Sequence, residues 1–197
     1  ASGIQYGFRL VECLLAAGRR VYLMVSPAAQ VVAGMETDLR LPGRPAELEA
    51  MLNGLYGVAP GRLRVFGRQQ WTAPVASGSN PPAAMVVCPC TTGTLGAIAA
   101  GLSEDLIDRA ADVALKEGRK LILVVRETPF SVIHLENMLR LARAGAVIMP
   151  ANPGFYFRPT GVEELVDFMV ARVLDHLGVA HTLGARWGAV EAGPDDA

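Results

Sequence analysis

Five short apolar runs rich in β-branched residues recur along the chain, each bounded by glycine, proline or charge. They lack the strict alternation of a strand that has one face in water, and they are too short for core helices. Such runs predict strands that are buried on both faces, as in a parallel sheet. The predicted strands are residues 19–26, 63–66, 84–89, 120–125 and 146–149.

Stretches with helical periodicity lie between these runs. Residues 4–18, 106–118 and 162–178 each end on a glycine, which is a common helix C-cap. Lys116 stands near the end of the second stretch, where the helix dipole favours positive charge. Strands that alternate with helices predict an α/β fold with three layers, a doubly wound parallel sheet between two helical layers.

Composition is consistent with one domain spanning residues 1–197. Hydrophobic residues make up 51% of the 197 positions, enough for a sizeable core. With 18 basic and 19 acidic residues, the net charge of −1 does not favour nucleic acid or an acidic membrane surface as a partner. No apolar run reaches the ~18 residues of a membrane span, and no basic-then-apolar targeting segment opens the chain.

The three cysteines do not indicate a metal or redox site. Cys88 and Cys90 have only a proline between them, whereas zinc sites use paired C-x2-C spacing and four ligands. No second cysteine pair exists, and the histidines lie far away in sequence. Two buried thiols at a strand end, in a reduced cytoplasmic setting, are the expected arrangement.

The turn after residues 84–89 has the chemistry of a phosphate cradle. A helix is expected to begin near Thr92, with free backbone N–H groups and the helix dipole directed outwards. Thr91, Thr92 and Thr94 add hydroxyls, and Gly93 allows close backbone approach. A well-capped helix would explain the same residues, so this turn alone leaves both interpretations open.

Two further turns have similar character. Ala1-Ser2-Gly3 stands directly before a helix, and Ser26 ends a strand with Pro27 at the first helical turn. Ligands of doubly wound sheets bind outside the carboxyl ends of the strands, so the three turns should converge on one crevice. The dinucleotide fingerprint and the P-loop are absent, which favours a mononucleotide such as FMN.

Charged and aromatic residues predict a second, phosphate-binding region. Arg126 and Glu127 follow a buried strand directly and so should lie over the crevice. Arginine, lysine and tyrosine suit a phosphate monoester, although each cation alone could form a surface ion pair. The candidates are Arg109 and Lys116 on one helix face, Tyr156 in a turn, and Arg172 on the last helix.

Three other features are open to interpretation. Residues 67–82 form a long loop rich in glycine, proline and serine, and its Trp71 suggests a lid or a subunit contact. Glu36, near a helix end, would alone be taken for a surface carboxylate. No strand run precedes Ala1, so either the sequence begins late or an edge of the sheet is unusual. Residues 154–168 are also consistent with a lid.

Several motifs together resemble a known family. They are ASGIQYGFRLVECL, VSPAAQVVAGMETD, CPCTTGTLGAIAAG, IDRAADVALKEGRKL, RETPFS, PGFY and the closing Arg186-Trp187. This set is similar to the flavin prenyltransferases of the UbiX type, which were long labelled aromatic acid decarboxylases. The likeness spans nearly the whole chain.

The resemblance implies a flavodoxin-like fold and a homo-oligomer, typically a dodecamer, with FMN between subunits. It implies metal-independent transfer of the dimethylallyl group of dimethylallyl monophosphate to N5 and C6 of reduced FMN. The product, prenylated FMN, would serve a partner decarboxylase of the UbiD type. Helix 162–178 and the tail 179–197 would pack on neighbouring subunits.

Matching positions imply a role for each candidate residue. The family has a strand and a glycine before Ala-Ser-Gly, and this sequence departs from the pattern there. FMN contacts would be Ala1, Ser2, Ser26, Thr91, Thr92, Gly93, Thr94 and Arg126. The site of the donor phosphate would comprise Lys116, Glu127, Tyr156 and Arg172. Catalytic residues would be Ser2, Glu36, Trp71, which faces the prenyl group, Arg109 and Glu127.

Two alternative functions differ in what they need. A flavin-dependent decarboxylase acting directly on an aromatic acid would need a histidine near the flavin, and none occurs before His134. A flavin carrier without catalysis would not need a cationic site beside the flavin.

Overall fold

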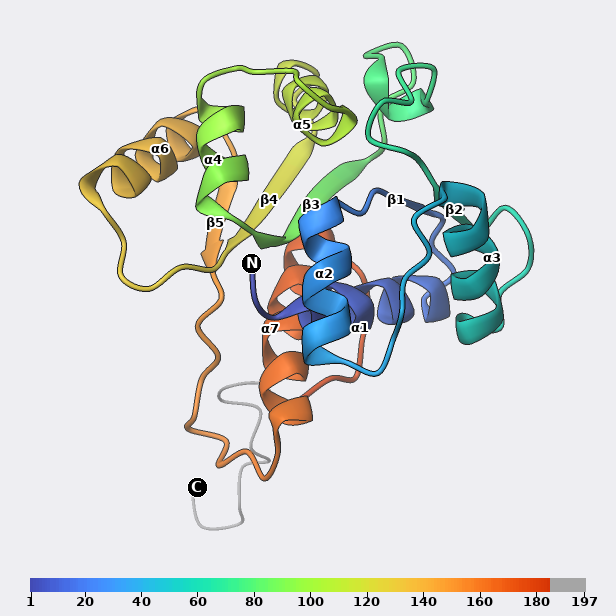
Figure 1. Cartoon of the computed structure of the whole chain (residues 1–197). Helices are drawn as coiled ribbons and strands as arrows, with labels where there is room; N and C mark the ends of the chain where they lie inside the picture. Colours follow the sequence, from blue (N-terminus) through green and yellow to red (C-terminus); the bar gives the residue numbers. More distant parts are fainter. Residues whose placement is uncertain (185–197) are drawn as a thin grey trace, which may run out of the picture.

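The computed structural model describes residues 1–184, in which helices cover parallel strands on both faces (Figure 1). The helices are α1 (Ile4–Ala16), α2 (Pro27–Glu36), α3 (Pro45–Tyr56), α4 (Thr92–Ala99), α5 (Leu106–Lys116), α6 (Val132–Arg143) and α7 (Val162–Leu177), with a short 3-10 helix η1 (Pro74–Ala76). The strands are β1 (Val21–Leu23), β2 (Leu63–Val65), β3 (Ala84–Cys90), β4 (Lys120–Val125) and β5 (Val147–Pro150).

Local sequence explains where the helices begin and end. The Ser26 side chain accepts a hydrogen bond from the backbone N–H of Ala29 at the start of α2 (3.1 Å), and Thr91 caps α4 in the same way. Asp105 caps α5 by accepting from two backbone N–H groups. Gly178 ends α7 in the left-handed conformation (φ 65°) that favours glycine.

The alternating side chains of β4 define the two cores. Leu121, Leu123 and Val125 pack on one face with residues of α4, α5 and α6. Ile122 and Val124 pack on the other face with residues of α1 and α7. Every β4 residue after Lys120 is buried, as expected for a central strand in a three-layer fold.

The sheet is not continuous as predicted. β3, β4 and β5 form one parallel sheet, while β1 pairs only with β2 in a second parallel sheet. A cavity of about 570 Å³ lies between β1 and β3 and is lined by both strands and by α1. We call this cavity the inter-sheet groove. The gap therefore lies between β1 and β3, inside the row of strands.

Two strands are less buried than predicted because of this groove. All the residues of β3 before Cys90 are only half-buried, as are Tyr22 and Leu23 of β1. Both strands lack a hydrogen-bonded neighbour on the side that faces the groove. The expectation of burial on both faces therefore holds for β4 and is wrong for β1 and β3.

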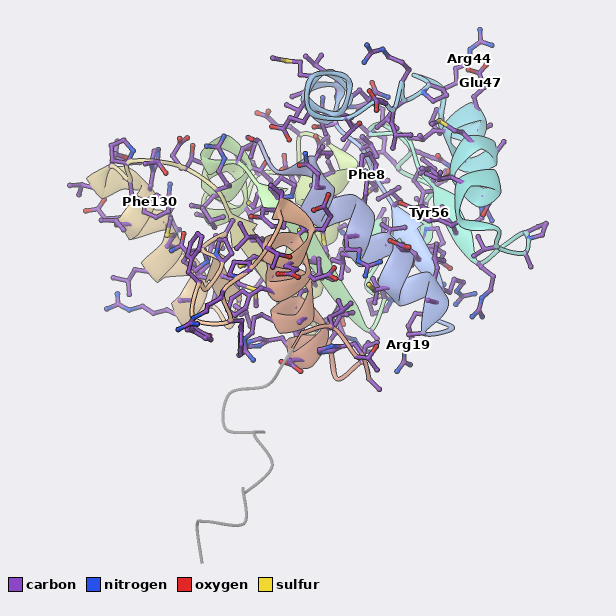
Figure 2. All side chains as sticks on the ribbon, turned by 90° about the horizontal axis from the view of Figure 1, so that it is seen from below. Phe8, Arg19, Arg44, Glu47, Tyr56 and Phe130 are labelled. Atoms are coloured by element: carbon purple, nitrogen blue, oxygen red, sulfur yellow. The ribbon has the colours of Figure 1, made fainter. Side chains whose placement is uncertain are left out.

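Helix α1 bridges the two sheets. Its Gly7 lies against β3 so closely that an added Cβ would be 2.7 Å from the carbonyl oxygen of Cys88. On the other side, the Tyr56 hydroxyl at the end of α3 donates to the carbonyl of Phe8 (3.2 Å), and Figure 2 shows both residues. Arg9 pairs with Asp167 of α7 at 2.7 Å. These contacts hold the two sheets together across the groove.

Several element boundaries differ from the predictions. The strand expected over 19–26 is regular only over β1, because the residues after Leu23 have no partner strand. Helices α3 and α6 were not singled out, since their exposed apolar residues blur the helical pattern. The 67–82 loop is irregular except for η1. None of the helices within residues 1–184 is long and apolar enough to cross a membrane.

Candidate active site

The three predicted hydroxyl-bearing turns meet at the carboxyl ends of the strands. Ala1, Ser26, Thr91 and Thr94 all line the same end of the molecule along the inter-sheet groove. Figure 1 shows the N-terminus beside the starts of α2 and α4. Ala1, Ser26, Thr91 and Thr94 thus border one groove. The start of α1 lies against the last residue of α2, Glu36.

Glu36, the last residue of α2, holds the first turn. Its Oε2 atom accepts hydrogen bonds from the backbone N–H groups of Gly3 (2.9 Å) and Ile4 (3.2 Å), at the start of α1. Burial opposes ionisation of this carboxyl, but hydrogen bonds from Ser2, Gly3 and Ile4, together with the charge of Arg126, outweigh it and lower its pKa. Glu36 is thus an ionised cap of α1, in contact with Ser2.

Arg126 carries an unused donor. Its backbone N–H donates to the carbonyl of Cys90 (3.1 Å), which joins the ends of β4 and β3. Its side-chain Nε atom is buried, and it has no hydrogen-bond partner among the residues described. A buried guanidinium nitrogen without a partner is costly unless a ligand supplies the acceptor. This position therefore fits an anionic or carbonyl-bearing group such as FMN.

Glu127 meets the threonine turn. The Thr92 hydroxyl lies 3.4 Å from Glu127 Oε2, and Glu127 Oε1 accepts from the backbone N–H of Thr128 (3.0 Å). Thr91 and Thr94 hydroxyls are 3.0 Å apart, and Gly93 between them is exposed. A carboxylate held against a helix N-terminus can exchange a proton with a neighbouring phosphate. The turn thus offers donors and one acidic group.

A second group of candidates lies along α5 and the 67–82 loop. Arg109 Nε donates to the carbonyl of Ala76 (3.0 Å), and its Nη1 pairs with Asp112 (2.9 Å). Lys116 Nζ contacts Glu117 at 2.6 Å, and an added Cβ on Gly78 would lie 2.7 Å from that nitrogen. The shared helix face predicted for Arg109 and Lys116 therefore faces the loop.

Trp71 lies in the same loop and is 46% exposed. An indole ring that open to water is available to a ligand or to another protein surface.

The remaining candidates are separated from the threonine turn within one chain. Lys116 precedes the first residue of β4 and Arg126 follows the last, so the six residues of β4, about 20 Å, lie between them. Arg172 is exposed on α7, which covers the opposite face of the sheet from α5. Tyr156 stacks against Phe168 of α7. One chain therefore does not bring all the predicted residues together.

Two residues that anchor the loop were missed. Arg68 donates two hydrogen bonds to Asp105, whose side chain is only 7% exposed and which also caps α5. Leu106 N–H in turn donates to the carbonyl of Arg68 (2.7 Å). The position of Asp105, just before the periodic apolar residues of α5, could have identified it as an acidic N-cap. Its partner Arg68, 37 positions earlier, has no such signal in the sequence.

The cysteines behave as structural residues. Burial raises the pKa of both the Cys88 and the Cys90 thiols to about 12, so both are protonated at neutral pH. Cys90 is fully buried in the core beside α4. A protonated thiol is a poor nucleophile.

The chain belongs to the flavoprotein family, whose model, described as "Flavoprotein", matches residues 1–174. Individual relatives show which kind of flavoprotein this chain resembles. A flavin prenyltransferase UbiX of Pseudomonas aeruginosa is 57% identical over 188 residues, which cover 95% of this chain and 90% of that protein.

Solved structures agree with this family assignment. AnUbiX (PadA1), in complex with FMN and dimethylallyl pyrophosphate, superposes with a TM-score of 0.84 at 39% identity, covering 97% of this chain and 94% of the other. A dodecameric FMN-dependent UbiX-like decarboxylase of Escherichia coli O157:H7 gives a TM-score of 0.82 at 38% identity, covering 96% and 95%. The doubly wound, flavodoxin-like α/β fold predicted from the sequence is thereby confirmed.

Proposed function

We propose that this protein is a flavin prenyltransferase that joins the dimethylallyl group of dimethylallyl monophosphate to reduced FMN. The observation that carries the proposal is that Ala1, Ser26, Thr91 and Thr94 line one groove. Beside it, Glu36 contacts Ser2 and feels the charge of Arg126, whose Nε atom is buried and has no partner in the described part of the chain. Relatives named flavin prenyltransferase UbiX, and the complex of AnUbiX with FMN and a prenyl phosphate, support it.

The reaction breaks an allylic C–O bond and forms bonds from the five-carbon group to flavin N5 and C6. Positive charge develops on the allyl group and negative charge on the leaving phosphate. Lys116, Arg172 and Arg109 stabilise the phosphate, and the π-face of Trp71 stabilises the allyl cation. Displacement of phosphate by N5 releases the N5 proton to the leaving phosphate. Glu127 relays a proton through the phosphate to the remaining C=C bond, and C6 attacks the tertiary carbon that this proton activates. Phosphate then takes the proton lost from C6, while Ser2 orients the flavin near N5.

Assembly into a homo-oligomer brings the separated residues together. Within one chain, Lys116 and Arg172 are remote from the threonine turn, so a complete donor site needs a neighbouring copy. Large apolar side chains are exposed on α2 and α6, as expected for subunit contacts. They are Val31, Met35, Val132, Ile133, Leu135 and Leu139. A dodecamer, as in the Escherichia coli structure, is the expected state.

Direct decarboxylation is disfavoured by the position of the histidines. His134 Nδ1 accepts from Ser131 N–H (3.2 Å) and completes the N-terminal capping box of α6. His176 lies in the last turn of α7, and His181 beyond it. Within residues 1–184, none of the three forms a hydrogen bond or ion pair with Arg126 or Glu127. A simple flavin carrier would leave the exposed cations Lys116 and Arg172 without a role.

The decisive measurement is the mass of the flavin. Purified protein is incubated with reduced FMN and dimethylallyl monophosphate, and the extracted flavin should gain one five-carbon unit. Glu127→Gln and Tyr156→Phe should retain FMN but lose most of the product. Unmodified flavin from the unaltered protein, or full turnover by both variants, would overturn the proposal.

Further proposals concern the use of the product and the location of the enzyme. Prenylated FMN would pass to a decarboxylase of the UbiD type, in the cytoplasm. A mixture of this protein, its two substrates and an unloaded UbiD-type enzyme should acquire decarboxylase activity, whereas a mixture lacking dimethylallyl monophosphate should not.

A further inference from the structure

The end of α7 holds Arg172 in a chain of hydrogen bonds. Arg172 Nη1 donates to Asp175 Oδ2 at 2.9 Å, one helical turn further on. Asp175 Oδ1 lies 3.2 Å from Nε2 of His181, because the chain after Gly178 turns back against the last turn of α7 (Figure 1). The three side chains come from one short stretch, yet they run from an exposed guanidinium to an enclosed imidazole.

The direction of each hydrogen bond is fixed by the backbone. Leu183 N–H donates to His181 Nδ1 (3.2 Å), so this nitrogen carries no proton. The proton of a neutral imidazole is then on Nε2, where it is donated to Asp175. His181 is therefore a donor to one carboxylate oxygen, and Arg172 is a donor to the other.

Burial decreases away from the imidazole. The His181 side chain is 7% exposed, that of Asp175 23%, and that of Arg172 52%. Val179, two residues before His181, is buried in the core cluster on the α1 and α7 face of the sheet. The core thus fixes the imidazole of His181, and the imidazole in turn fixes the carboxylate of Asp175.

We propose that Asp175 and His181 are positioning residues, which hold the Arg172 guanidinium so that its remaining N–H groups bind the phosphate of the prenyl donor. This inference rests on the proposed function, because it assigns the anion that Arg172 receives. Asp175 accepts a hydrogen bond from Nη1 of Arg172, so Nε and Nη2 of Arg172 remain for the donor. These two nitrogens form the edge of a guanidinium that binds phosphate with two parallel hydrogen bonds. Fixing the long side chain in advance reduces the entropy lost on binding.

The proposal predicts an effect on donor binding alone. Asp175→Asn keeps the shape of the side chain but removes its charge, so it should raise KM for dimethylallyl monophosphate about threefold to tenfold, the range expected for a partly exposed ion pair and a released arginine rotamer. The affinity for FMN should stay within about twofold, because Asp175 acts only through Arg172, which is placed at the donor phosphate.

A double-mutant cycle separates positioning from a merely structural role. In an Arg172→Ala background, Asp175→Asn should leave KM unchanged, because there is no guanidinium left to orient. His181→Ala should raise KM in the same way as Asp175→Asn. His181→Gln should restore most of the wild-type KM, because its amide nitrogen can donate from the place of Nε2. Thermal unfolding of each variant reports whether it folds.

The outcomes distinguish this inference from the proposed function. If Arg172→Ala raises KM for the donor but Asp175→Asn does not, the positioning role is refuted and the prenyltransferase assignment stands. An equal effect of Asp175→Asn with and without Arg172 also overturns it, since the effect would not pass through the guanidinium. Absence of any product from the unaltered protein refutes the proposed function first.

Discussion

The two sheets of this protein differ in how completely they are covered. β4 lies between β3 and β5, and five of its six residues are buried. β1 pairs with β2 alone, and two of its three residues are half-buried beside the inter-sheet groove. Both strands are apolar runs of similar composition. The difference shows that a strand's burial depends on its neighbours as much as on its own side chains.

The parts of the candidate site also differ in which of the two sheets carries them. Arg126, Glu127 and the threonine turn stand on the well-packed sheet, where backbone bonds such as Arg126 N–H to Cys90 O fix them. Ser26 follows β1 on the far side of the groove. Helix α1 packs on both sheets and so connects these two parts of the site. Glu36, at the end of α2, is hydrogen-bonded to the start of α1.

The largest effect should come from matched leucine deletions in the two sheets. Leu123→Ala on β4 removes a fully buried side chain and should lower the free energy of unfolding by about 2–5 kcal/mol. Leu23→Ala on β1 should cost less than about 2 kcal/mol, because that side chain lines the groove and is already half-exposed. Urea unfolding monitored by circular dichroism measures both. Equal losses would show that the two sheets are equally well packed in solution.

Filling the groove should reduce the difference in burial between β1 and β4. A segment of six β-branched residues joined to Ala1 could pair with the open edges of both β1 and β3. We expect roughly 2 kcal/mol of added stability, which would raise the thermal unfolding midpoint by about 5 °C or more.

The control is an extension of equal length with proline at alternate positions, which cannot form the ladder. If both extensions give the same midpoint, the groove does not accept a strand. Hydrogen exchange at the amides of Tyr22 and Met85 would locate any pairing, because both residues line the groove.

The cap that joins the two halves should show a pH-dependent effect of about 1 kcal/mol. Glu36 has a lowered pKa in the folded protein, so its contribution to stability is present above the unfolded glutamate pKa of about 4.3 and is lost as pH falls through the folded value. Glu36→Gln should therefore be less stable than the wild type at pH 7, with the gap closing below about pH 4. Thermal scans across pH 3–7 test this, and a gap that is constant with pH would contradict it.

The smallest effect should come from an exposed ion pair at the start of α3. The N-cap residue Arg44 and Glu47 are 84% and 55% exposed, and Figure 2 shows them at the outer edge of the molecule. Arg44→Ala should change stability by less than about 0.5 kcal/mol. Arg9→Ala, which removes the half-buried contact of α1 with Asp167, should cost about 1 kcal/mol and serves as the comparison.

Sequence patterns predicted the elements better than their packing. The 120–125 run became β4 with the same bounds, and Ser26, Thr91 and Gly178 cap helices as their residue types indicated. The sequence showed that no strand run precedes Ala1, but it did not locate the interruption between β1 and β3, because hydrophobicity reports how apolar a run is and not which strand lies beside it.

The structure brings predicted site residues together where they follow strands. Thr92, Arg126 and Glu127 come directly after β3 or β4, so topology alone places them together. Contacts between distant segments, such as Arg68 with Asp105, have no local signature. The cations Lys116 and Arg172 were grouped by their chemistry, yet in one chain they lie on opposite faces of the sheet, a separation that residue type cannot reveal.

The close approach of Gly78 to α5 has a mechanical consequence. The side-chain ends of Lys116 and Glu117 fill the space that a Cβ at position 78 would need, so any larger residue there would have to push both charged groups aside. The orientation of the ammonium group over the loop thus depends on the missing side chain of one glycine.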